Sequence, residues 1–361
     1  MKLTPPERLR YNRHLILPEV GELGQIKLKQ GSVLIVGAGG LGSPAALYLG
    51  AAGVGRIGLI DPDCVSISNL QRQILYSVDQ VDRPKVGCAK EKLQSLNPEI
   101  EIETYESTLN AHNALELIQS YDVIIDGTDN FPARYLINDA CVLAGKPNIY
   151  GAISRFDAQV SLISAPGGPC YRCLYPEPPS AGAIPNCNEA GVLGVLPGIV
   201  GTIQATEALK WILEIGTSLS GRLMIIDALS MEFSTLRLER KKDCAACGTN
   251  PSIRTLIESN PSCSMSLTPE DFIEKLRPGK TFQLLDVRSQ EEYDGSHLEE
   301  AIHIPLVNLK SEVDKLNSQQ EIVVYCESGI RSLKAIGILK TLGFNQVWQL
   351  EGGLRNFHCR K

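Results

Sequence analysis

The stretch from Gly31 to Gly42 constrains the fold more than any other part of the chain. It reads GSVLIVGAGGLG, and its VLIV run contains no polar residue. Such a run is typical of a strand that is buried on both faces of a parallel sheet. A glycine-rich turn follows, and an apolar helix is expected from Ser43 to Ala52. Strand, turn and helix in this order predict an α/β fold.

Two later segments repeat the pattern of an apolar strand that ends in acidic residues. They read RIGLIDPD (56–63) and DVIIDGTDN (122–130). Strands that alternate with helices predict a doubly wound, Rossmann-like parallel sheet, whose ligands bind beyond the carboxyl ends of the strands. The acids expected at that edge are Asp61, Asp63, Asp126 and Asp129.

The composition changes after Gly248. The following residues, up to Asp271, are rich in Pro, Ser, Thr and Asn, which is typical of a linker. We therefore expect a domain at 1–248, a linker at 249–266 and a second domain at 267–361.

The second domain has the pattern of a smaller α/β fold. Thr268 can cap a helix that has Pro269 at its first position. Strands are expected at 282–288 and 321–326, and a helix from Ser332.

Charge and hydropathy exclude several classes of function. The 361 residues carry a formal net charge of −6, whereas nucleic-acid-binding proteins usually have a basic face. No apolar run reaches the roughly 18–20 residues that a membrane span needs. The N-terminus, MKLTPPERLRYNRH, has no apolar core and does not read as a secretory signal. We expect a cytoplasmic protein that binds neither nucleic acid nor membranes.

A GxGxxG motif, formed by Gly37, Gly39 and Gly42, lies between the first strand and the helix. Glycines permit the tight turn and let a phosphate approach the backbone at the helix N-terminus. Asp61, after the next strand, can bind ribose hydroxyls. By itself this motif fits an NAD-dependent oxidoreductase equally well.

The segment DPDCVSISNLQRQ (61–73) favours a different nucleotide enzyme, because hydride transfer does not need it. Arg72 offers a forked donor that suits phosphate oxygens. Lys85 is a second cation in reach of the same region. A solvated surface charge is the alternative interpretation for each of these two residues.

Together these motifs resemble the signature of one enzyme family. GAGGLG, then DxDxVxxSNLxRQ, a lysine and TDN (128–130) form the signature of the MoeB/ThiF family, relatives of the ubiquitin-activating enzymes, and RYNRH (10–14) resembles the family's N-terminal arm. The resemblance covers about residues 8–248 and implies adenylyl transfer from ATP. The ATP-contacting residues that it implies are Gly40, Asp61, Ser68, Asn69, Leu70, Gln71, Arg72, Lys85, Asp129 and Asn130.

The resemblance also implies catalytic roles in this reaction. Asp129 would position Mg²⁺, and Arg13 would reach the phosphates in a neighbouring subunit's site, which implies a homodimer. A charge on a helix surface is the alternative for Arg13. Adenylation makes an unreactive carboxylate into an acyl-adenylate, and negative charge gathers at the α-phosphate in the transition state. Arg72, Lys85, Mg²⁺ and backbone N–H groups would stabilise that charge.

Two CxxC pairs stand apart from the nucleotide motifs. Cys170 and Cys173 form CYRC, and Cys244 and Cys247 form CAAC. Four thiolates can hold one tetrahedral Zn²⁺, and the resemblance implies such a site at both positions. Buried free cysteines or a redox pair are the alternatives. A closed four-cysteine site has no open coordination position, so this zinc would be structural.

Cys187 lies between the two pairs, in IPNCNEAGVLGVLPG. The surrounding Gly, Pro and Asn predict a loop, in which a thiol could be exposed. Related activating enzymes carry an acceptor cysteine in a corresponding loop, so the resemblance implies a catalytic role. An inert cysteine is the alternative, because MoeB-like members form the adenylate without a protein thioester.

Cys326 ends the strand EIVVY and begins CESGIRS. A cysteine at a strand-to-helix turn lies near a helix N-terminus, which favours the thiolate and would stabilise a persulfide anion. The loop CxxxxRS, together with LLDVRSQEEYDGSHLEEAIHIP and LEGG (350–353), resembles rhodanese-like sulfurtransferase domains over about 267–358. Phosphatase loops on this fold are normally one residue longer, and inactive modules have generally lost the cysteine.

The fused arrangement resembles the adenylyltransferase–sulfurtransferases that serve molybdopterin synthase and ubiquitin-like sulfur carriers. It implies that the chain adenylates the C-terminal glycine of a carrier that ends in Gly-Gly. A persulfide on Cys326 would then attack the acyl-adenylate, and a thiocarboxylate would result. A cysteine desulfurase is the implied sulfur donor. The alternative is a chain that only adenylates, with the second domain as a docking module.

Overall fold

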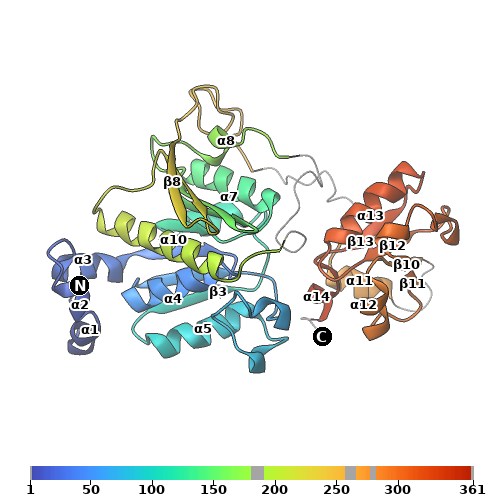
Figure 1. The fold of residues 1–361 in the computed structure, drawn as a ribbon, viewed down its shortest axis with the longest axis horizontal. Coiled ribbons are helices and arrows are strands. Elements are labelled where there is room, and N and C mark those ends of the chain that lie inside the picture. Colours follow the sequence, from blue (N-terminus) through green and yellow to red (C-terminus); the bar gives the residue numbers. More distant parts are fainter. Residues whose placement is uncertain (1, 180–190, 257–265, 277–281, 359–361) are drawn as a thin grey trace. The chain divides into compact units, whose positions relative to one another are not determined.

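The computed structural model describes residues 2–179, 191–256, 266–276 and 282–358. The chain splits into two compact units, Met1–Ser259 and Asn260–Lys361. Each unit has a sheet and a hydrophobic core of its own (Figure 1). Among the described residues, no helix is long and apolar enough to cross a membrane.

Unit 1 is built on an eight-stranded sheet in the order β3-β2-β1-β4-β5-β6-β7-β8. The strands from β3 to β5 in this order pair in parallel, as predicted, whereas β6, β7 and β8 add to the sheet by antiparallel pairing. Strand order reverses between β1 and β4, which is where parallel sheets bind their ligands. The strands are β1 (Ser32–Val36), β2 (Arg56–Ile60), β3 (Glu101–Tyr105), β4 (Val123–Asp126), β5 (Asn148–Ser154), β6 (Asp157–Ile163), β7 (Arg222–Asp227) and β8 (Glu232–Arg237).

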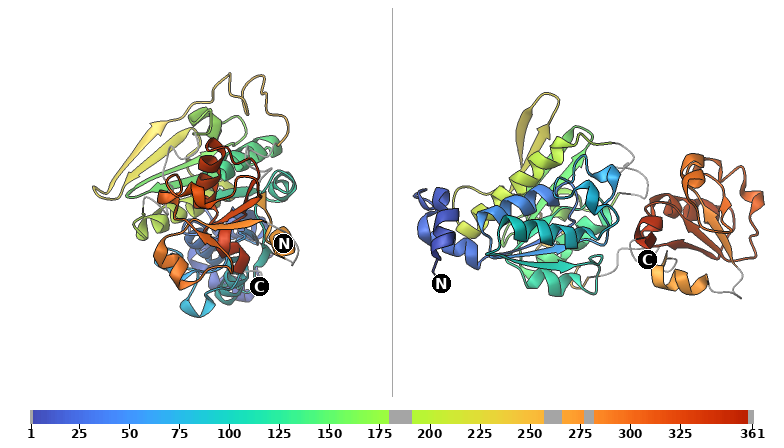
Figure 2. Two further views of the ribbon diagram at one scale, coloured as in Figure 1. Left: turned by 90° about the vertical axis from the view of Figure 1, so that its right-hand side faces the viewer. Right: turned by 90° about the horizontal axis from the view of Figure 1, so that it is seen from below.

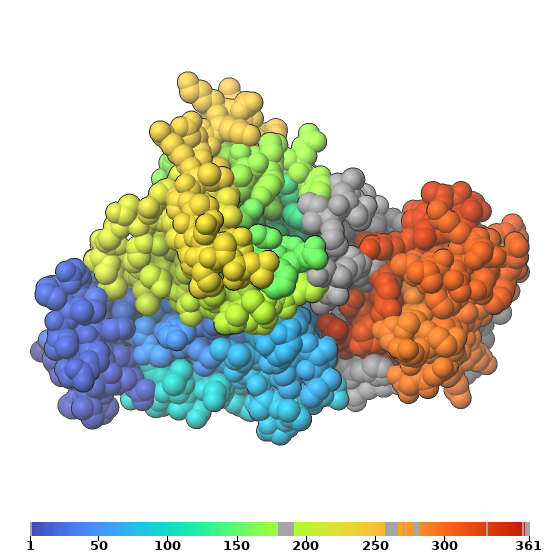
Figure 3. Space-filling model, in the orientation of Figure 1, coloured from blue at the N-terminus to red at the C-terminus, as the bar shows by residue number. Residues whose placement is uncertain are grey.

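Helices cover both faces of this sheet, and the β7–β8 ribbon extends from the rest of the unit (Figure 2). The N-terminal helices, dark blue in Figure 3, lie at one end of the unit, where α3 packs against α10. The helices are α1 (Pro5–Arg10), α2 (Asn12–Leu15), α3 (Gly21–Gln30), α4 (Gly42–Ala52), α5 (Lys85–Leu96), α6 (Ala114–Gln119), α7 (Phe131–Ala144), α8 (Tyr171–Leu174) and α10 (Val195–Leu213), with 3-10 turns η1 (Ile67–Asn69) and η2 (Val78–Gln80).

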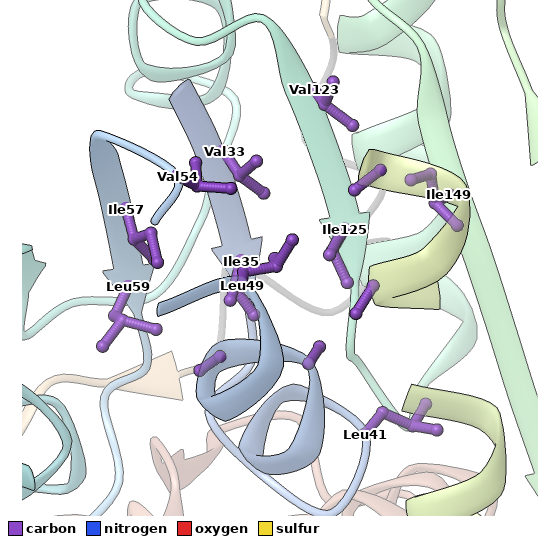
Figure 4. Packing of buried hydrophobic residues seen from close by; sticks show 14 of the residues in the cluster. Val33, Ile35, Leu41, Leu49, Val54, Ile57, Leu59, Val123, Ile125 and Ile149 are labelled. Carbon is purple, nitrogen blue, oxygen red and sulfur yellow. The ribbon is translucent and has the colours of Figure 1, made fainter. Parts of the chain in front are cut away.

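The core of unit 1 explains the apolar run in β1. Val33 and Ile35 pack with Leu49 of α4 on one face of the sheet (Figure 4). Leu34 points to the other face and packs with Ile137 of α7. Successive strand residues face opposite sides, and both sides are covered here, so every residue of β1 is buried. The prediction of a doubly buried strand is confirmed.

Unit 2 is built on a five-stranded parallel sheet in the order β11-β10-β12-β13-β9. Its strands are β9 (Ser266–Leu267), β10 (Gln283–Asp286), β11 (Ile302–His303), β12 (Ile322–Tyr325) and β13 (Val347–Leu350). Its helices are α11 (Pro269–Lys275), α12 (Gln290–Gly295), α13 (Ile330–Thr341) and α14 (Gly353–His358), with 3-10 turns η4 (Leu306–Asn308) and η5 (Val313–Lys315).

Two helix starts in unit 2 can be compared with the sequence predictions. The predicted cap is confirmed, because Thr268 Oγ1 accepts a hydrogen bond of 3.1 Å from the amide of Asp271. The helix expected from Ser332 begins two residues earlier, at Ile330. Gly329 has φ +83°, a conformation that glycine adopts without strain, so the chain can turn into the helix directly after it. Ser332 therefore lies inside the first helical turn.

Candidate nucleotide and sulfur-transfer sites

The glycine-rich turn lies at the carboxyl end of β1, where it touches the segment that follows β4. Gly37 has φ +92°, and a Cβ built there would lie 2.9 Å from the carbonyl oxygen of Gly127. A Cβ on Gly42 would lie 2.0 Å from the carbonyl oxygen of Gly37. The two backbone segments are therefore in direct contact, and helix α4 begins at once at this edge, with the amide of Ser43 donating to the carbonyl of Gly39 (2.9 Å).

Asp61 follows β2 and faces the glycine-rich turn. Its carboxylate accepts hydrogen bonds of 2.8 Å from the backbone amides of Ala38 and Asp63. Burial raises the pKa of the Asp61 carboxyl, and the ammonium of Lys85, 3.8 Å away, opposes that increase. Lys85 is only 3% exposed and forms an ion pair of 2.9 Å with Asp63. The interpretation of Lys85 as a solvated surface charge is therefore wrong.

The segment after Asp63 brings Arg72 to the glycine-rich turn. The Arg72 guanidinium donates to Asn69 Oδ1 (2.9 Å) and to the carbonyl of Ser68 (3.3 Å). A Cβ on Gly40 would lie 3.5 Å from Arg72 Cγ, so these two residues are neighbours. The family resemblance also implied Ser68, Leu70 and Gln71 as ATP contacts. Leu70 is half-buried, while Ser68 and Gln71 are exposed.

Two buried polar atoms in this segment have no partner among the described residues. They are Nδ2 of Asn69 and Oε1 of Gln73, whose residues are 5% and 4% exposed. Buried polar atoms in proteins are nearly always paired. These two atoms are therefore suited to hydrogen bonds with a ligand at the glycine-rich turn.

Asp129 and Asn130 lie in the exposed turn after β4. Asn130 caps α7, since its Oδ1 accepts a hydrogen bond of 3.0 Å from the amide of Ala133. The contact between Gly37 and Gly127 brings this turn to the same edge as Asp61 and the glycine-rich turn. The structure thus gathers the predicted nucleotide-site residues of this chain at the carboxyl ends of β1, β2 and β4.

Two predicted site residues are not part of this cluster. Arg13 is exposed in α2, and its reach into a neighbouring subunit stays a prediction. Cys187 lies outside the described residues.

The four cysteines of the two CxxC pairs come together in space. Their sulfur atoms all lie within 4.8 Å of one another, with 3.6 Å between Cys170 and Cys244 and 3.4 Å between Cys173 and Cys247. Zinc–sulfur bonds of about 2.3 Å in a tetrahedron separate the sulfurs by about 3.8 Å, so the cluster fits Zn²⁺. The amide of Lys241 donates to the Cys173 sulfur (3.4 Å), which suits a metal-bound thiolate. Such an ion would tie α8 to the end of unit 1.

Cys326 lies at the end of β12 and is buried. Its sulfur accepts a hydrogen bond of 3.4 Å from the amide of Ser332, which lies in the first turn of α13. Helix N-terminal amides stabilise an anion, and they lower the free energy of a thiolate or persulfide. The hydroxyl of Ser332 is held in turn by the carbonyl of Gly329 (2.9 Å) and by Gln349 Oε1 (3.2 Å).

Charged residues fix the loop that follows Cys326. Arg331 forms a bidentate ion pair with Glu292 of α12. That pairing lowers the pKa of Glu292 to about 2. The backbone of Gly353 also lies against the loop, since an added Cβ there would lie 2.3 Å from the Cys326 carbonyl oxygen. The loop is therefore held in one conformation around the sulfur.

The sequence analysis did not identify two residues that hold backbone segments of the candidate nucleotide site in place. Tyr76 donates from its hydroxyl to the carbonyl of Ala38 (2.7 Å) in the glycine-rich turn, and Arg134 reaches the turn that carries Asp129. Arg134 follows Asn130 by four residues, about one turn of a helix that begins after an N-cap, and that spacing could have identified it. No comparable signal marks Tyr76.

Curated relatives span most of the chain. "Probable adenylyltransferase/sulfurtransferase MoeZ" of Mycobacterium tuberculosis is 41% identical over 98% of this chain and 93% of its own length. "Adenylyltransferase and sulfurtransferase MOCS3" of Sus scrofa is 43% identical over 94% of this chain and 82% of its own. "Sulfur carrier protein adenylyltransferase" of Thermus thermophilus is 49% identical over 73% of this chain and its own full length.

A solved structure shares the fold. The structure titled "Crystal structure of E. coli MccB + ATP" aligns with a TM-score of 0.59 and 24% identity, over 66% of this chain and 73% of that chain. At this identity the likeness shows the fold alone.

Family models match both units. The ThiF family matches residues 11–247, and the rhodanese-like domain matches residues 268–358. With the relatives above, these matches define an enzyme that is an adenylyltransferase and a sulfurtransferase. The chain belongs to the ThiF family and carries a rhodanese-like domain after the ThiF part.

Proposed function

We propose that this enzyme uses ATP to adenylate the C-terminal glycine of a ubiquitin-like sulfur carrier and then converts that glycine to a thiocarboxylate. One observation carries the proposal. A single chain holds both the residues gathered at the carboxyl ends of β1, β2 and β4 and a cysteine whose sulfur meets a helix N-terminal amide. Joining the two units raises the effective concentration of a persulfide near the adenylate.

The first step joins the carrier to AMP. A carboxylate oxygen of the carrier's C-terminal glycine attacks the α-phosphorus of ATP, and pyrophosphate leaves with the electrons of the broken P–O bond. Arg72 and the amides of the glycine-rich turn would stabilise the charge on the phosphates, and Asp61 would hold the ribose. Asp129 would bind Mg²⁺, which neutralises phosphate charge when it is bound with ATP.

The second step transfers sulfur. The terminal sulfur of a Cys326 persulfide attacks the acyl carbon, AMP leaves, and an acyl disulfide joins the carrier to Cys326. A second thiol then attacks the Cys326 sulfur, so that the carrier leaves as a thiocarboxylate and a disulfide remains. Cys187 is our proposal for that thiol, and an external thiol would reduce the disulfide. A cysteine desulfurase would renew the persulfide.

The proposal also covers the domain boundaries, the oligomeric state and the cellular location of the protein. It assigns 1–248 to adenylyl transfer, 249–266 to a linker and 267–361 to sulfur transfer. It also assigns a homodimer, in which Arg13 completes the partner's nucleotide site, and a cytoplasmic location. Sedimentation velocity tests the dimer, since a monomer at micromolar concentration would contradict it.

ATP–pyrophosphate exchange tests the first step. The assay is run with the zinc-loaded chain and with each of several Gly-Gly carriers in turn, and Asp129→Ala is the control. We expect exchange with at least one carrier, none without a carrier, and none in the variant. Absence of exchange with every carrier would overturn the proposal, and nicotinamide binding would be tested next.

A further inference from the structure

The turn that carries Asp129 is held at both backbone polar groups of one residue, Thr128, by buried charged side chains. Asp126, the last residue of β4, is 1% exposed, and its Oδ1 accepts hydrogen bonds from the amide of Thr128 (3.0 Å) and from Thr128 Oγ1 (2.6 Å). Arg134 of α7 is 7% exposed, and its Nη2 donates to the carbonyl of Thr128 (3.4 Å). The N–H and the C=O of Thr128 therefore both have charged partners.

Asp126 and Arg134 each form hydrogen bonds with Thr128. Within the described ranges they form no ion pair with each other, and Oδ2 of Asp126 and Nε of Arg134 have no hydrogen-bond partner there. Burial of two opposite charges usually demands close pairing, because each loses its hydration. The guanidinium of Arg134 also lies over the rings of Phe131 and Tyr150. Thr128 is nevertheless held at its N–H by Asp126 and at its C=O by Arg134, which indicates that the position of the turn matters.

The backbone before the turn is anchored as well. Gln204 of α10 donates from Nε2 to the carbonyl of Asp126 (2.8 Å), and the amide of Gly127 donates to the carbonyl of Val36 (2.8 Å). After the turn, the side chain of Asn130 is engaged as the cap of α7. The exposed Asp129 thus lies between fixed neighbours.

We propose that Asp126, Thr128 and Arg134 are positioning residues that direct the carboxylate of Asp129 toward the Mg²⁺ of bound ATP. This inference deepens the proposed function and rests on it. The residue fits the ion, because Asp129 offers a solvent-exposed carboxylate, the kind of oxygen ligand that Mg²⁺ takes, at the ligand-binding edge of the sheet. Mg²⁺ demands nearly octahedral geometry, so a carboxylate on a loose turn would bind it more weakly. Asp126 and Arg134 act on Asp129 through the backbone of Thr128, the residue that precedes it.

The test measures cation affinity in addition to activity. Thr128→Val removes the hydroxyl that meets Asp126, Thr128→Ser restores it, and Arg134→Gln removes the guanidinium. The matched control is Thr206→Val on α10, whose exposed hydroxyl donates to the carbonyl of Thr202 in the same helix. Electron paramagnetic resonance measures Mn²⁺ binding to each enzyme–ATP complex, and the Mg²⁺ concentration for half-maximal pyrophosphate exchange is measured in parallel. Melting temperature and zinc content check folding.

We expect Thr128→Val and Arg134→Gln to raise the Mn²⁺ dissociation constant and the half-saturating Mg²⁺ concentration by about 10-fold, as supporting residues around metal ligands do. Thr128→Ser and Thr206→Val should stay within about two-fold of the wild type. Wild-type Mn²⁺ affinity in folded Thr128→Val would overturn the inference, and so would wild-type affinity in Asp129→Ala. If Arg134→Gln fails to fold, Thr128→Val decides alone. If the wild type shows no carrier-dependent pyrophosphate exchange, the proposed function is refuted. Mn²⁺ binding to the enzyme–ATP complex still tests the present inference in that case.

Discussion

The carboxylate of Glu292 forms two hydrogen bonds to the guanidinium of Arg331, each 2.6 Å long. Glu292 also completes the capping box of α12, where the amide of Ser289 donates to it over 3.0 Å. Arg331 closes the six-residue loop CESGIR that begins with Cys326. A single carboxylate therefore ties the sulfur-transfer loop to the start of a neighbouring helix.

This ion pair predicts a pH-dependent contribution to the stability of unit 2. Arg331 lowers the pKa of Glu292 to about 2, from an ordinary value of 4.5. A lowered folded-state pKa means that the stabilisation is complete above pH 4.5 and is lost as the pH falls toward 2. Glu292→Gln should therefore cost about 1 kcal/mol at pH 7, since the pair is about one-third exposed.

Urea unfolding of the full chain measures this effect, with Trp348 fluorescence followed in a Trp211→Phe background. The difference between Glu292→Gln and its parent should shrink below pH 4.5. Glu312→Gln is the matched control, because Glu312 pairs with the single ammonium of Lys315, whose side chain is 59% exposed, so this pair should contribute less. A difference that is the same at pH 7 and pH 3 would contradict the assignment.

Sulfur transfer should depend on Cys326. Cys326→Ala removes the nucleophile, so thiosulfate:cyanide sulfurtransfer by the full chain should fall about 100-fold or more. Cyanide-labile sulfur on the protein should disappear as well. Cys88→Ala is the control, because Cys88 is an equally buried cysteine in unit 1 and should leave the rate unchanged. A wild type that transfers sulfur from no donor would support the docking-module alternative.

Loss of the four-cysteine cluster should release zinc and destabilise unit 1. In Cys173→Ser, zinc measured by atomic absorption should fall from one ion per chain to nearly none. The melting temperature should drop by about 10 °C or more, because metal binding contributes to folding. Cys141→Ala, a buried cysteine outside the cluster, should keep its zinc. Full zinc occupancy in Cys173→Ser would refute the assignment.

The glycine-rich turn predicts opposite outcomes for two glycine-to-alanine changes. Gly42→Ala places a Cβ 2.0 Å from the carbonyl oxygen of Gly37, so it should cost about 3 kcal/mol or more and weaken ATP binding. Gly87→Ala, inside α5, meets nothing within 4 Å and should stabilise the protein by about 0.5–1 kcal/mol. Thermal melting and ATP titration measure both. Equal stability of the two variants would contradict the close backbone contact.

Local patterns in the sequence were sufficient for several parts of this structure. The apolar run in β1, the cap at Thr268 and the acids after β2 and β4 were all predicted correctly, because each follows from neighbouring residues alone. The start of α13 was placed two residues late, because the turn at Gly329 decides where the helix begins. The antiparallel strands β6 to β8 were not predicted. Pairing between β6 and β7, which are far apart in the chain, leaves little local trace, whereas β5–β6 and β7–β8 are joined by short connections that the sequence analysis missed.

The sequence by itself determined which chemistry is present: glycines for a phosphate, acids at strand ends, two CxxC pairs and a cysteine before a helix. Only the tertiary structure decided how those groups are held. It buried Lys85 against Asp63, placed four sulfurs within 4.8 Å across about 70 residues of chain, and directed Asp126 and Arg134 at Thr128. A motif is a set of residue types at short spacing in the sequence. Burial and long-range contacts depend instead on how the sheet brings separate segments together at one edge.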